Sequence, residues 1–310
     1  MTTPVFIDGA AGTTGLEIVE RLTAHPHFEP VVLDEARRKD ADARREALND
    51  NPFAVLCLPD DAAREAVALV DPASTTRIVD ASSAHRVADG WTYGFPEVIG
   101  RASIAEATRV ANPGCYPTGF IALVAPLVRA GLLPADWAFT VNAVSGYSGG
   151  GKALIERFEA NPDIAFRTYG LSLDHKHLPE MQRHAGLEHS VLFAPSVVPS
   201  FRGMLAEVPL HLGAMRTDPQ ADALRDALSE FYSDSDVVHV VQDDDTAELL
   251  LHRDAAPWDG MELRVFGNEG GWNARLIAVL DNLGKGASGA AIQNLNLMAG
   301  FPETASLHLR

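Results

Sequence analysis

The length, composition and charge of the chain exclude several classes of protein. It has 310 residues, 46% of them apolar, and a formal net charge of −17 at pH 7. This length predicts two domains or one large α/β domain, and the acidic charge argues against nucleic acid and anionic membranes as partners. Neither a signal peptide nor an apolar run of about 18 residues is visible. With only two cysteines, no disulfide framework is expected, so we predict a cytoplasmic protein.

The N-terminal segment has the pattern of a dinucleotide-binding turn. A short apolar run, 5–7, leads into Gly-Ala-Ala-Gly-Thr-Thr-Gly at 9–15, and an amphipathic helical pattern follows. Glycines at such spacing let the backbone approach a pyrophosphate, which then lies at the helix N-terminus. A glycine-rich turn without a ligand is the alternative. The expected cofactor contacts are Gly9, Gly12, Thr13, Thr14 and Gly15.

The end of the second predicted strand bears on the choice of cofactor. The strand at 30–33 ends at Asp34 and Glu35, and an acidic residue at this place often binds the ribose hydroxyls of NAD. Arg37 and Arg38 follow, with Lys39, and such cations can neutralise the 2′-phosphate of NADP. We expect NADP, with Arg37 and Arg38 among its contacts. The alternative is that this basic run is the solvated face of a helix over 35–48.

Two further strands, at 53–58 and 76–80, give the first part of the chain a βαβαβαβ pattern with short turns. This pattern predicts an α/β fold of Rossmann type, with a doubly wound parallel sheet. Ligands bind beyond the carboxyl ends of the strands in such sheets. The segments 9–15, 82–86 and 112–115 are all expected at that edge.

Cys115 lies in a setting that favours reactivity. Pro113 and Gly114 predict a sharp turn between a strand-like run at 108–112 and an apolar helical run at 120–130. Cys115 is therefore expected at or just before a helix N-terminus, where N–H groups and the helix dipole favour a thiolate and can stabilise an oxyanion. A buried structural cysteine is the alternative. That alternative is the one we adopt for Cys57, which lies inside an apolar run.

The second half of the chain is rich in β-like runs, at 137–145, 191–198, 205–212, 237–241, 261–266 and 273–280. Two convincing helices interrupt them, one at 219–232 and a shorter one after Pro179. Strands in long succession predict an α+β domain with a mostly antiparallel sheet. The expected division is an NADP-binding domain at 1–114, completed by a C-terminal helix within 284–310, and a catalytic and dimerisation domain at 115–283.

Polar clusters in the second half are candidates for chemistry. His175 and His177 lie within Asp-His-Lys-His-Leu-Pro-Glu at 174–180. His-x-His can ligate a metal, but no Cys/His partner set accompanies it, so we expect acid/base catalysis and no metal. Arg202 offers a guanidinium for a substrate carboxylate or phosphate, with a solvated arginine as the alternative. Lys152 follows three glycines, yet the nucleoside-triphosphate pattern G-x-x-x-x-G-K-[ST] is absent.

The assembled motifs resemble the N-acetyl-γ-glutamyl-phosphate reductases of arginine biosynthesis, in their shorter form, which are similar to aspartate-semialdehyde dehydrogenases. The resemblance covers nearly the full length. It rests on Asn-Pro-Gly-Cys-Tyr-Pro-Thr at 112–118, Val-Ser-Gly-Tyr-Ser-Gly-Gly-Gly-Lys at 144–152, His-Lys-His-Leu-Pro-Glu at 175–180 and Asp-Asn-Leu-Gly-Lys-Gly-Ala-Ser-Gly at 281–289. The last string is shared with aspartate-semialdehyde dehydrogenases, where its asparagine lies near the nicotinamide.

The resemblance implies roles for particular residues. Cys115 is the expected nucleophile, and the longer form of the family has His-Arg-His in place of His175-Lys176-His177, so the motif leaves the acid/base open between the two histidines. We favour His177, because a helix starting near Pro179 would put it at the helix mouth, facing Cys115. The other implied residues are Glu180 for catalysis, Ser82 and Asn282 for the cofactor, and Arg86, Asn112, Lys152 and Arg202 for the substrate, with Arg86 meeting its phosphate.

The implied reaction is the NADPH-dependent reduction of N-acetyl-γ-glutamyl phosphate to N-acetylglutamate 5-semialdehyde through a Cys115 thioester, in a homodimer or homotetramer. Three alternatives remain. An aspartate-semialdehyde dehydrogenase uses the same fold, although Tyr116-Pro117 and the His-Lys-His string argue against it. A reductase of lysine biosynthesis would act on an acyl group attached to a carrier protein. A catalytically dead NADP-binding regulator is disfavoured by the intact Cys115, His177 and Arg86.

Overall fold

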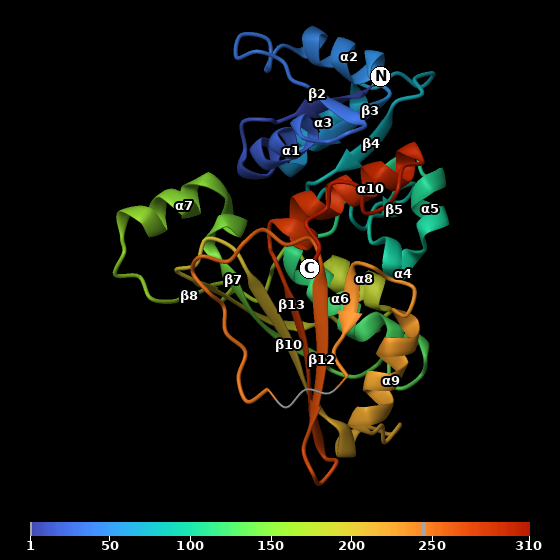
Figure 1. Cartoon of the computed structure of the whole chain (residues 1–310), viewed down its shortest axis with the longest axis vertical. Helices are drawn as coiled ribbons and strands as arrows, with labels where there is room; N and C mark the ends of the chain where they lie inside the picture. The colour runs from blue at the N-terminus through green and yellow to red at the C-terminus, as the bar shows by residue number, and fades with distance from the viewer. Residues whose placement is uncertain (1, 243–245) are drawn as a thin grey trace. The chain divides into compact units, whose positions relative to one another are not determined.

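The computed structural model describes residues 2–242 and 246–310, so Met1 of the first expected domain and residues 243–245 of the second lie outside the description. The chain divides into two compact units, Met1–Gly114 with Ala287–Leu307, and Cys115–Gly286 with His308–Arg310. Each unit is built on a sheet of its own (Figure 1). The expected boundaries placed 284–286 and 308–310 with the first domain, whereas they belong to the second unit.

The first unit contains a six-stranded sheet whose strand pairs are all parallel, in the order β2-β1-β3-β4-β6-β5. The strands are β1 (Thr3–Asp8), β2 (Phe28–Val31), β3 (Phe53–Leu56), β4 (Arg77–Asp80), β5 (Thr92–Tyr93) and β6 (Arg109–Ala111). The direction of winding reverses between β1 and β3. Such a switch point opens a ligand crevice at the carboxyl ends of the strands. The predicted Rossmann-type parallel sheet is confirmed.

Side chains of β1 alternate between the two faces of this sheet, as strand geometry requires. Val5 and Ile7 pack into a core with α1 (Thr13–Thr23), α5 (Arg101–Glu106) and α10 (Gly289–Ala299). Phe6 packs on the opposite face with α2 (Ala41–Asp50) and α3 (Asp60–Ala68). A short helix, α4 (Pro96–Ile99), precedes α5. The expected C-terminal helix is therefore α10, and it completes the first unit.

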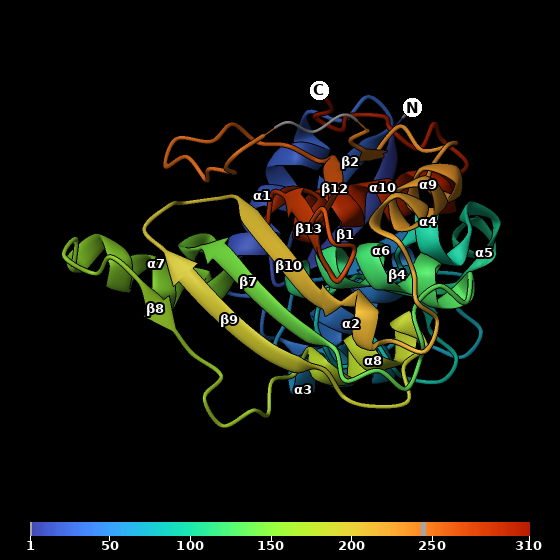
Figure 2. The ribbon, with the colours of Figure 1, turned by 90° about the horizontal axis from the view of Figure 1, so that it is seen from below.

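The second unit contains a seven-stranded mixed sheet in the order β11-β12-β13-β10-β7-β9-β8. The strands are β7 (Thr140–Gly146), β8 (Arg167–Thr168), β9 (Leu192–Val198), β10 (Met204–His211), β11 (Val238–Val240), β12 (Met261–Gly267) and β13 (Asn273–Leu280). Among the described strands, β7–β9 and β11–β12 pair in parallel and the other pairs are antiparallel. Figure 2 shows β9, β7 and β10 running side by side. The sheet is thus mostly antiparallel, as expected.

Helix α6 (Cys115–Arg129) packs on β10 and β13 of this sheet. Helices α8 (Leu178–Ala185) and α9 (Ala221–Phe231) pack against α6. A Cβ at Gly119 would lie 2.9 Å from the Cβ of Ala206, so the helix approaches the sheet closely. Sequence analysis missed α7 (Gly151–Ala160), which starts in the glycine run after the 3₁₀ turn Tyr147–Gly150. Only Leu154 and Phe158 of α7 are buried, so its apolar pattern is weak. No described helix is long and apolar enough to cross a membrane.

Candidate active site

A cavity of about 550 Å³ lies beyond the carboxyl ends of β1, β2 and β3 in the first unit. It is lined by the glycine-rich turn after β1 and by Leu58 after β3. Gly9 has a φ of +89°, and a Cβ there would lie 2.3 Å from the carbonyl oxygen of Cys57. Only glycine fits this close approach. The volume and the position at the switch point suit a nucleotide, and α1 begins at Thr13 directly after the turn.

Three cations line the same cavity, namely Arg38, Lys39 and Arg44. Arg44 was not expected. Its Nε and Nη2 donate to Oδ2 of Asp8, at 3.0 and 2.8 Å. Burial raises the pKa of the Asp8 carboxyl, while the hydrogen bond and charge of Arg44 act in the opposite direction. The buried carboxylate at the end of β1 is thus neutralised from α2, and Arg44 is fixed at the cavity wall.

The two arginines predicted to bind NADP are placed differently. Arg38 lines the cavity and pairs with Glu35 at 3.3 Å. Arg37 pairs with Glu46 at 3.0 Å, and both side chains are more than half exposed. The alternative of a helix over 35–48 is wrong for its first part, because residues 35–39 form turns and α2 begins at Ala41.

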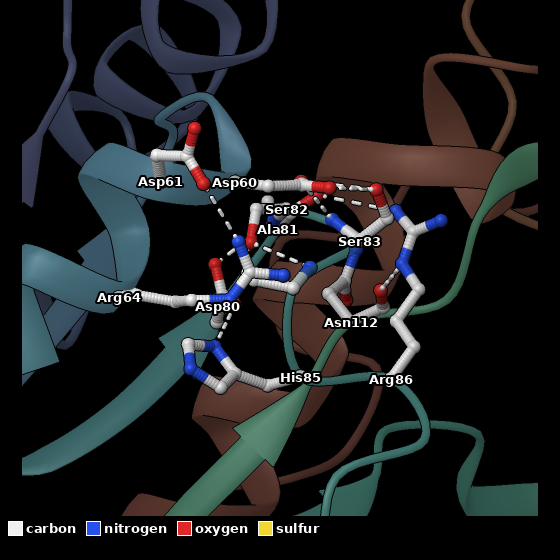
Figure 3. A network of polar contacts seen from close by, with 11 residues as sticks. Asp60, Asp61, Arg64, Asp80, Ala81, Ser82, Ser83, His85, Arg86 and Asn112 are labelled. Carbon is white, nitrogen blue, oxygen red and sulfur yellow. Dashed lines mark hydrogen bonds and ion pairs between the residues drawn. The ribbon is translucent and has the colours of Figure 1, made fainter. Parts of the chain in front are cut away.

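Two buried or half-buried carboxylates hold the loop that follows β4 (Figure 3). Asp80 accepts hydrogen bonds from Ser82 N–H at Oδ1, at 2.9 Å, and from Ser82 Oγ at Oδ2, at 2.7 Å. Nδ1 of His85 lies 2.6 Å from the same Oδ2. Asp60 accepts from the N–H and the hydroxyl of Ser83, at 2.9 and 2.7 Å. Ser82, expected at the cofactor, therefore also shapes its own loop.

Arg86 and Asn112 connect this loop with the end of β6. Nε of Arg86 donates to the carbonyl oxygen of Asn112 at 3.0 Å, and its Nη2 donates to the carbonyl oxygen of Ala81 at 3.2 Å. The side chain of Asn112 accepts from Asn294 of α10 at 3.1 Å and donates to the carbonyl of Ala287 at 2.9 Å. Asn112 is 1% exposed. Its expected contact with substrate stays a prediction, and its visible role is to fix the strand end that precedes the cysteine.

Cys115 is the first residue of α6, which confirms its predicted place at a helix N-terminus. It forms no disulfide and is partly exposed. A Cβ at Gly286 would lie 2.9 Å from the Cβ of Cys115, so a glycine is needed beside it. In contrast, burial raises the pKa of Cys57 to about 12, and the nearby charges of Asp80 and Asp8 act in the same direction. The raised pKa of Cys57 agrees with its expected structural role, while the reactivity of Cys115 stays a prediction.

In the second unit, His177 lies next to Tyr116, the residue that follows Cys115. The rings of Tyr116 and His177 are 6.1 Å apart, centre to centre. His177 is the N-cap of α8 and is 7% exposed. Its N–H donates to Nδ1 of His175 at 3.2 Å, and the two rings are 4.7 Å apart. Burial lowers the pKa of His175, and the charge of Lys176 adds to this effect. His175 thus accepts a hydrogen bond from the backbone of His177, and the choice of acid/base between the two stays a prediction.

Two tyrosines complete the surroundings of Cys115, and sequence analysis did not single out Tyr169. Tyr116 donates from its hydroxyl to the carbonyl of Ser196 at 3.1 Å. Burial raises the pKa of Tyr169 to about 12, with a hydrogen bond to Tyr116 lowering it and the charge of Cys115 raising it. The guanidinium of Arg167 lies 4.3 Å from the centre of the Tyr169 ring. Both phenols therefore stay protonated at neutral pH and can act as donors.

The second unit contains three further residues with expected roles, Asn282, Arg202 and Lys152. Asn282 accepts from Gly203 N–H at 2.9 Å and donates to Ser148 Oγ at 2.8 Å, so it joins the loop after β7 to the loop before β10. Arg202 pairs with Asp281 at 2.8 Å. Lys152 is exposed in the first turn of α7. Their expected cofactor and substrate contacts stay predictions.

The second unit also contains Glu180, which is 1% exposed in the first turn of α8. It thus shares one helix end with His177. Among the described residues, no group of three or more His, Cys, Asp or Glu side chains could hold a metal ion. The catalytic role expected of Glu180 stays a prediction.

Two family models match this chain, and their limits coincide closely with the two units. The model described as "Semialdehyde dehydrogenase, NAD binding domain" matches residues 4–107, and "Semialdehyde dehydrogenase, dimerisation domain" matches residues 115–282. N-acetyl-gamma-glutamyl-phosphate reductase 2 of Nostoc sp. is 47% identical over 318 residues, covering 98% of both chains. The N-acetyl-gamma-glutamyl-phosphate reductase of Brucella ovis is 49% identical over 309 residues, covering 97% of this chain and all of the relative.

The chain belongs to the N-acetyl-γ-glutamyl-phosphate reductase family. This family shares its fold with a solved aspartate semialdehyde dehydrogenase of Candida albicans, which contains NADP. That structure superposes on the chain with a TM-score of 0.69 at 15% identity, covering 96% of this chain and 99% of the other. The likeness shows the fold. The resemblance found in the motifs is thereby confirmed at the level of the family.

The residues predicted for the site are divided between the two units of the chain. Cys115, His177, His175 and Glu180 lie in the second unit, around the starts of α6 and α8. The glycine turn, Arg38, Ser82, Arg86 and Asn112 lie in the first. Arg44 and Tyr169 carried no local signal, because their partners, Asp8 and Tyr116, are distant in sequence.

Proposed function

We propose that this chain reduces N-acetyl-γ-glutamyl phosphate to N-acetylglutamate 5-semialdehyde and inorganic phosphate, with NADPH, in arginine biosynthesis. The observation that carries the proposal is Cys115 at the first position of α6, with His177 next to Tyr116. A thiolate at a helix N-terminus and a positioned histidine are the parts that acyl transfer through a thioester requires. The names of relatives at 47–49% identity support the choice of substrate.

Cys115 performs the first step. Its thiolate attacks the acyl carbon, the new C–S bond forms, and the bond between that carbon and the phosphate oxygen breaks, so inorganic phosphate leaves with the electron pair. Backbone N–H groups in the first turn of α6 are available to the oxyanion of the tetrahedral state. Arg86 is the proposed partner of the phosphate, since a guanidinium binds phosphate through paired donors.

The second step reduces the thioester. NADPH, when bound, supplies the hydride that converts the thioester carbonyl to a hemithioacetal. His177 is the proposed acid/base, giving a proton to the oxygen or sulfur as the hemithioacetal collapses to the aldehyde and releases Cys115. His175 holds the backbone of His177. The pKa of Tyr169 is raised to about 12, so its hydroxyl stays protonated at neutral pH and offers a further donor in this unit.

The first unit fits the cofactor. The cavity follows the glycine-rich turn, and Gly9 leaves room where a side chain would collide with the backbone. We assign the pyrophosphate to the turn with Gly12, Thr13, Thr14 and Gly15, at the start of α1. For the 2′-phosphate of NADP, Arg38, Lys39 and Arg44 supply positive charge at the cavity wall.

We also infer that the chain assembles into a homo-oligomer in the cytoplasm. Residues 115–282 match a model described as a dimerisation domain, which supports a homodimer or homotetramer. Light scattering would then give two or four times the chain mass of 33.2 kDa. Neither cysteine forms a disulfide, and a reducing cytoplasm, which preserves a catalytic thiol, remains the predicted location.

The deciding experiment measures NADP⁺ reduction with N-acetylglutamate 5-semialdehyde and phosphate. Aspartate semialdehyde and NAD⁺ serve as comparators, and the Cys115→Ser variant controls for background. We expect the acetylated substrate to be used with a kcat/KM that exceeds that of aspartate semialdehyde by orders of magnitude. Preference for aspartate semialdehyde, or binding of NADP without turnover of either aldehyde, would replace the proposal by one of its alternatives.

A further inference from the structure

The carboxylate of Asp80, at the end of β4, binds several groups of the loop that follows this strand in the first unit. It is fully buried and accepts three hydrogen bonds, two from Ser82 and one from His85. An ionised carboxylate can only accept, so Nδ1 of His85 carries the hydrogen at this 2.6 Å contact. Hydrogen bonds to a charged acceptor are stronger than neutral ones. His85 is therefore fixed on one edge of its ring.

The face of the His85 ring is fixed as well. It stacks on Trp91, with ring centres 4.1 Å apart and planes 12° from parallel. The guanidinium of Arg109 lies 5.9 Å from the centre of the Trp91 ring. His85 is 9% exposed. Edge and face together leave this side chain a single orientation, although no step of the proposed reaction uses it.

The residue after His85 is Arg86, the proposed partner of the substrate phosphate. Figure 3 shows the His85 ring directed to Asp80 and the Arg86 guanidinium directed elsewhere, near Asn112. The backbone between them is short, and N–H of Ala88 donates back to the carbonyl of His85 at 3.1 Å, which closes the turn. The hydrogen bond from His85 to Asp80 therefore ties the turn that carries Arg86 to the end of β4.

We propose that His85 is a positioning residue for Arg86, acting through its hydrogen bond to Asp80, and so sets the affinity of the site for the phosphate group of the substrate. The inference rests on the proposed function, in which Arg86 meets that phosphate. It assigns to the Asp80–His85 couple a task in substrate binding that is separate from the chemistry of Cys115.

Two variants separate the hydrogen bond from the ring stack. His85→Asn keeps an N–H donor near the position of Nδ1 and loses the stack on Trp91, whereas His85→Phe keeps an aromatic ring and loses the donor. The readouts are the KM for inorganic phosphate and kcat in the semialdehyde-oxidising direction, with the KM for NADP⁺ and the thermal midpoint as controls. Calorimetric titration of inorganic phosphate gives a dissociation constant that does not depend on turnover.

For His85→Phe we expect the KM and dissociation constant for phosphate to rise about tenfold or more, the range for a lost hydrogen bond to a charged group. The KM for NADP⁺ should change little, the thermal midpoint should fall because buried Asp80 loses one of its hydrogen bonds, and His85→Asn should restore most of the phosphate affinity. Unchanged phosphate affinity in His85→Phe would overturn the inference. So would an equal loss of every parameter, since that marks a purely structural residue.

The proposed function and this inference fail in different ways. A wild-type chain that binds phosphate but turns over no semialdehyde would remove the function, while the two His85 variants would still decide the inference by calorimetry. A wild-type chain that turns over the semialdehyde with phosphate affinity indifferent to His85 would leave the function and remove the inference. A wild-type chain that neither turns over nor binds phosphate would remove both.

Discussion

Nε of Arg86 donates a hydrogen bond of 3.0 Å to the carbonyl oxygen of Asn112, three residues before Cys115 in the chain. The same bond joins the loop after β4 to the end of β6, where Asn112 N–H donates to the carbonyl of Asp80 at 2.7 Å. This hydrogen bond fixes the position of Nε and thereby the orientation of the guanidinium plane of Arg86. A planar, preorganised fork is what recognition of phosphate favours.

Arg86→Lys keeps the positive charge and removes this fork. Lysine has no Nε–H at that position and offers a point charge on a flexible stem. We expect the KM for phosphate to rise roughly tenfold to a hundredfold, since hydrogen bonds to charged groups contribute about 1.5–3 kcal/mol. Steady-state kinetics in the semialdehyde-oxidising direction measure it. Near wild-type constants would mean that charge alone suffices and that the bond to Asn112 has no functional weight.

The two histidines should differ in their effect on rate. His177 lies beside Tyr116 at the start of α8, while His175 supports it through its N–H. His177→Ala should lower kcat on the order of a hundredfold or more, the usual range for a positioned acid/base group. His175→Ala should cost less. If His175→Ala proved the more damaging of the two at saturating substrate, their roles would be exchanged.

Cofactor discrimination should depend on Arg38 and not on Arg37. Arg38 lines the cavity, whereas Arg37 pairs with Glu46 at the surface. Arg38→Ala should weaken NADP by roughly one to two orders of magnitude and leave NAD nearly unchanged. Arg37→Ala is the matched control and should alter neither. Fluorescence titration of both cofactors measures this, and equal losses for NADP and NAD in Arg38→Ala would rule out a contact with the 2′-phosphate.

Folding stability should fall on mild acidification because of His25. Burial lowers its pKa below the ordinary value of 6.5, the hydrogen bond to the carbonyl of Ala305 opposes this, and the charge of His27 adds to it. Nδ1 of His25 accepts from His27 N–H at 3.2 Å, so this nitrogen is needed without its proton. The contribution to stability is complete above pH 6.5. It is lost as the pH falls, because the unfolded chain takes up the proton first.

His25→Gln retains a donor for the carbonyl of Ala305 and does not titrate. The slope of unfolding free energy against pH should become shallower as the pH falls below about 6.5, by up to about 1.4 kcal/mol per pH unit. Urea unfolding at several pH values measures the slope. His239→Gln, at an exposed histidine, is the control. A slope that stays unchanged in His25→Gln would show that other groups cause the acid sensitivity.

Local sequence patterns predicted much of the fold and part of the candidate site. The glycine turn and the helix behind Cys115 depend on residues close in sequence, and the parallel sheet follows from the repeated alternation of strand and helix; each lies where its pattern indicated. The position of His177 at the start of α8 also followed from a local signal, Pro179. The parallel pairs β7–β9 and β11–β12 lie within a sheet whose other described pairs are antiparallel. Strand patterns alone do not reveal such partners.

The missed residues share this dependence on distant contacts. Arg44 reaches Asp8 across 36 positions of the chain. In the sequence it appears as one of several charges on a polar helix. Tyr169 belongs to the site through Tyr116 and Cys115, which precede it by more than fifty residues. The helix α7 was missed for another reason, because only two of its residues are buried.

The central claim is that Cys115 forms a thioester with the acyl group, and it is tested most directly before any reduction takes place. Rapid mixing of the enzyme with N-acetyl-γ-glutamyl phosphate, without NADPH, should release a burst of about one phosphate per active chain. Peptide mass spectrometry should place the N-acetylglutamyl group on Cys115. Cys57→Ala should retain the burst, because the pKa of Cys57 is raised to about 12 and its thiol stays protonated at neutral pH. Cys115→Ser should lose the burst while binding NADPH as before. A burst that persists in Cys115→Ser, or an acyl group found on another residue, would contradict the account.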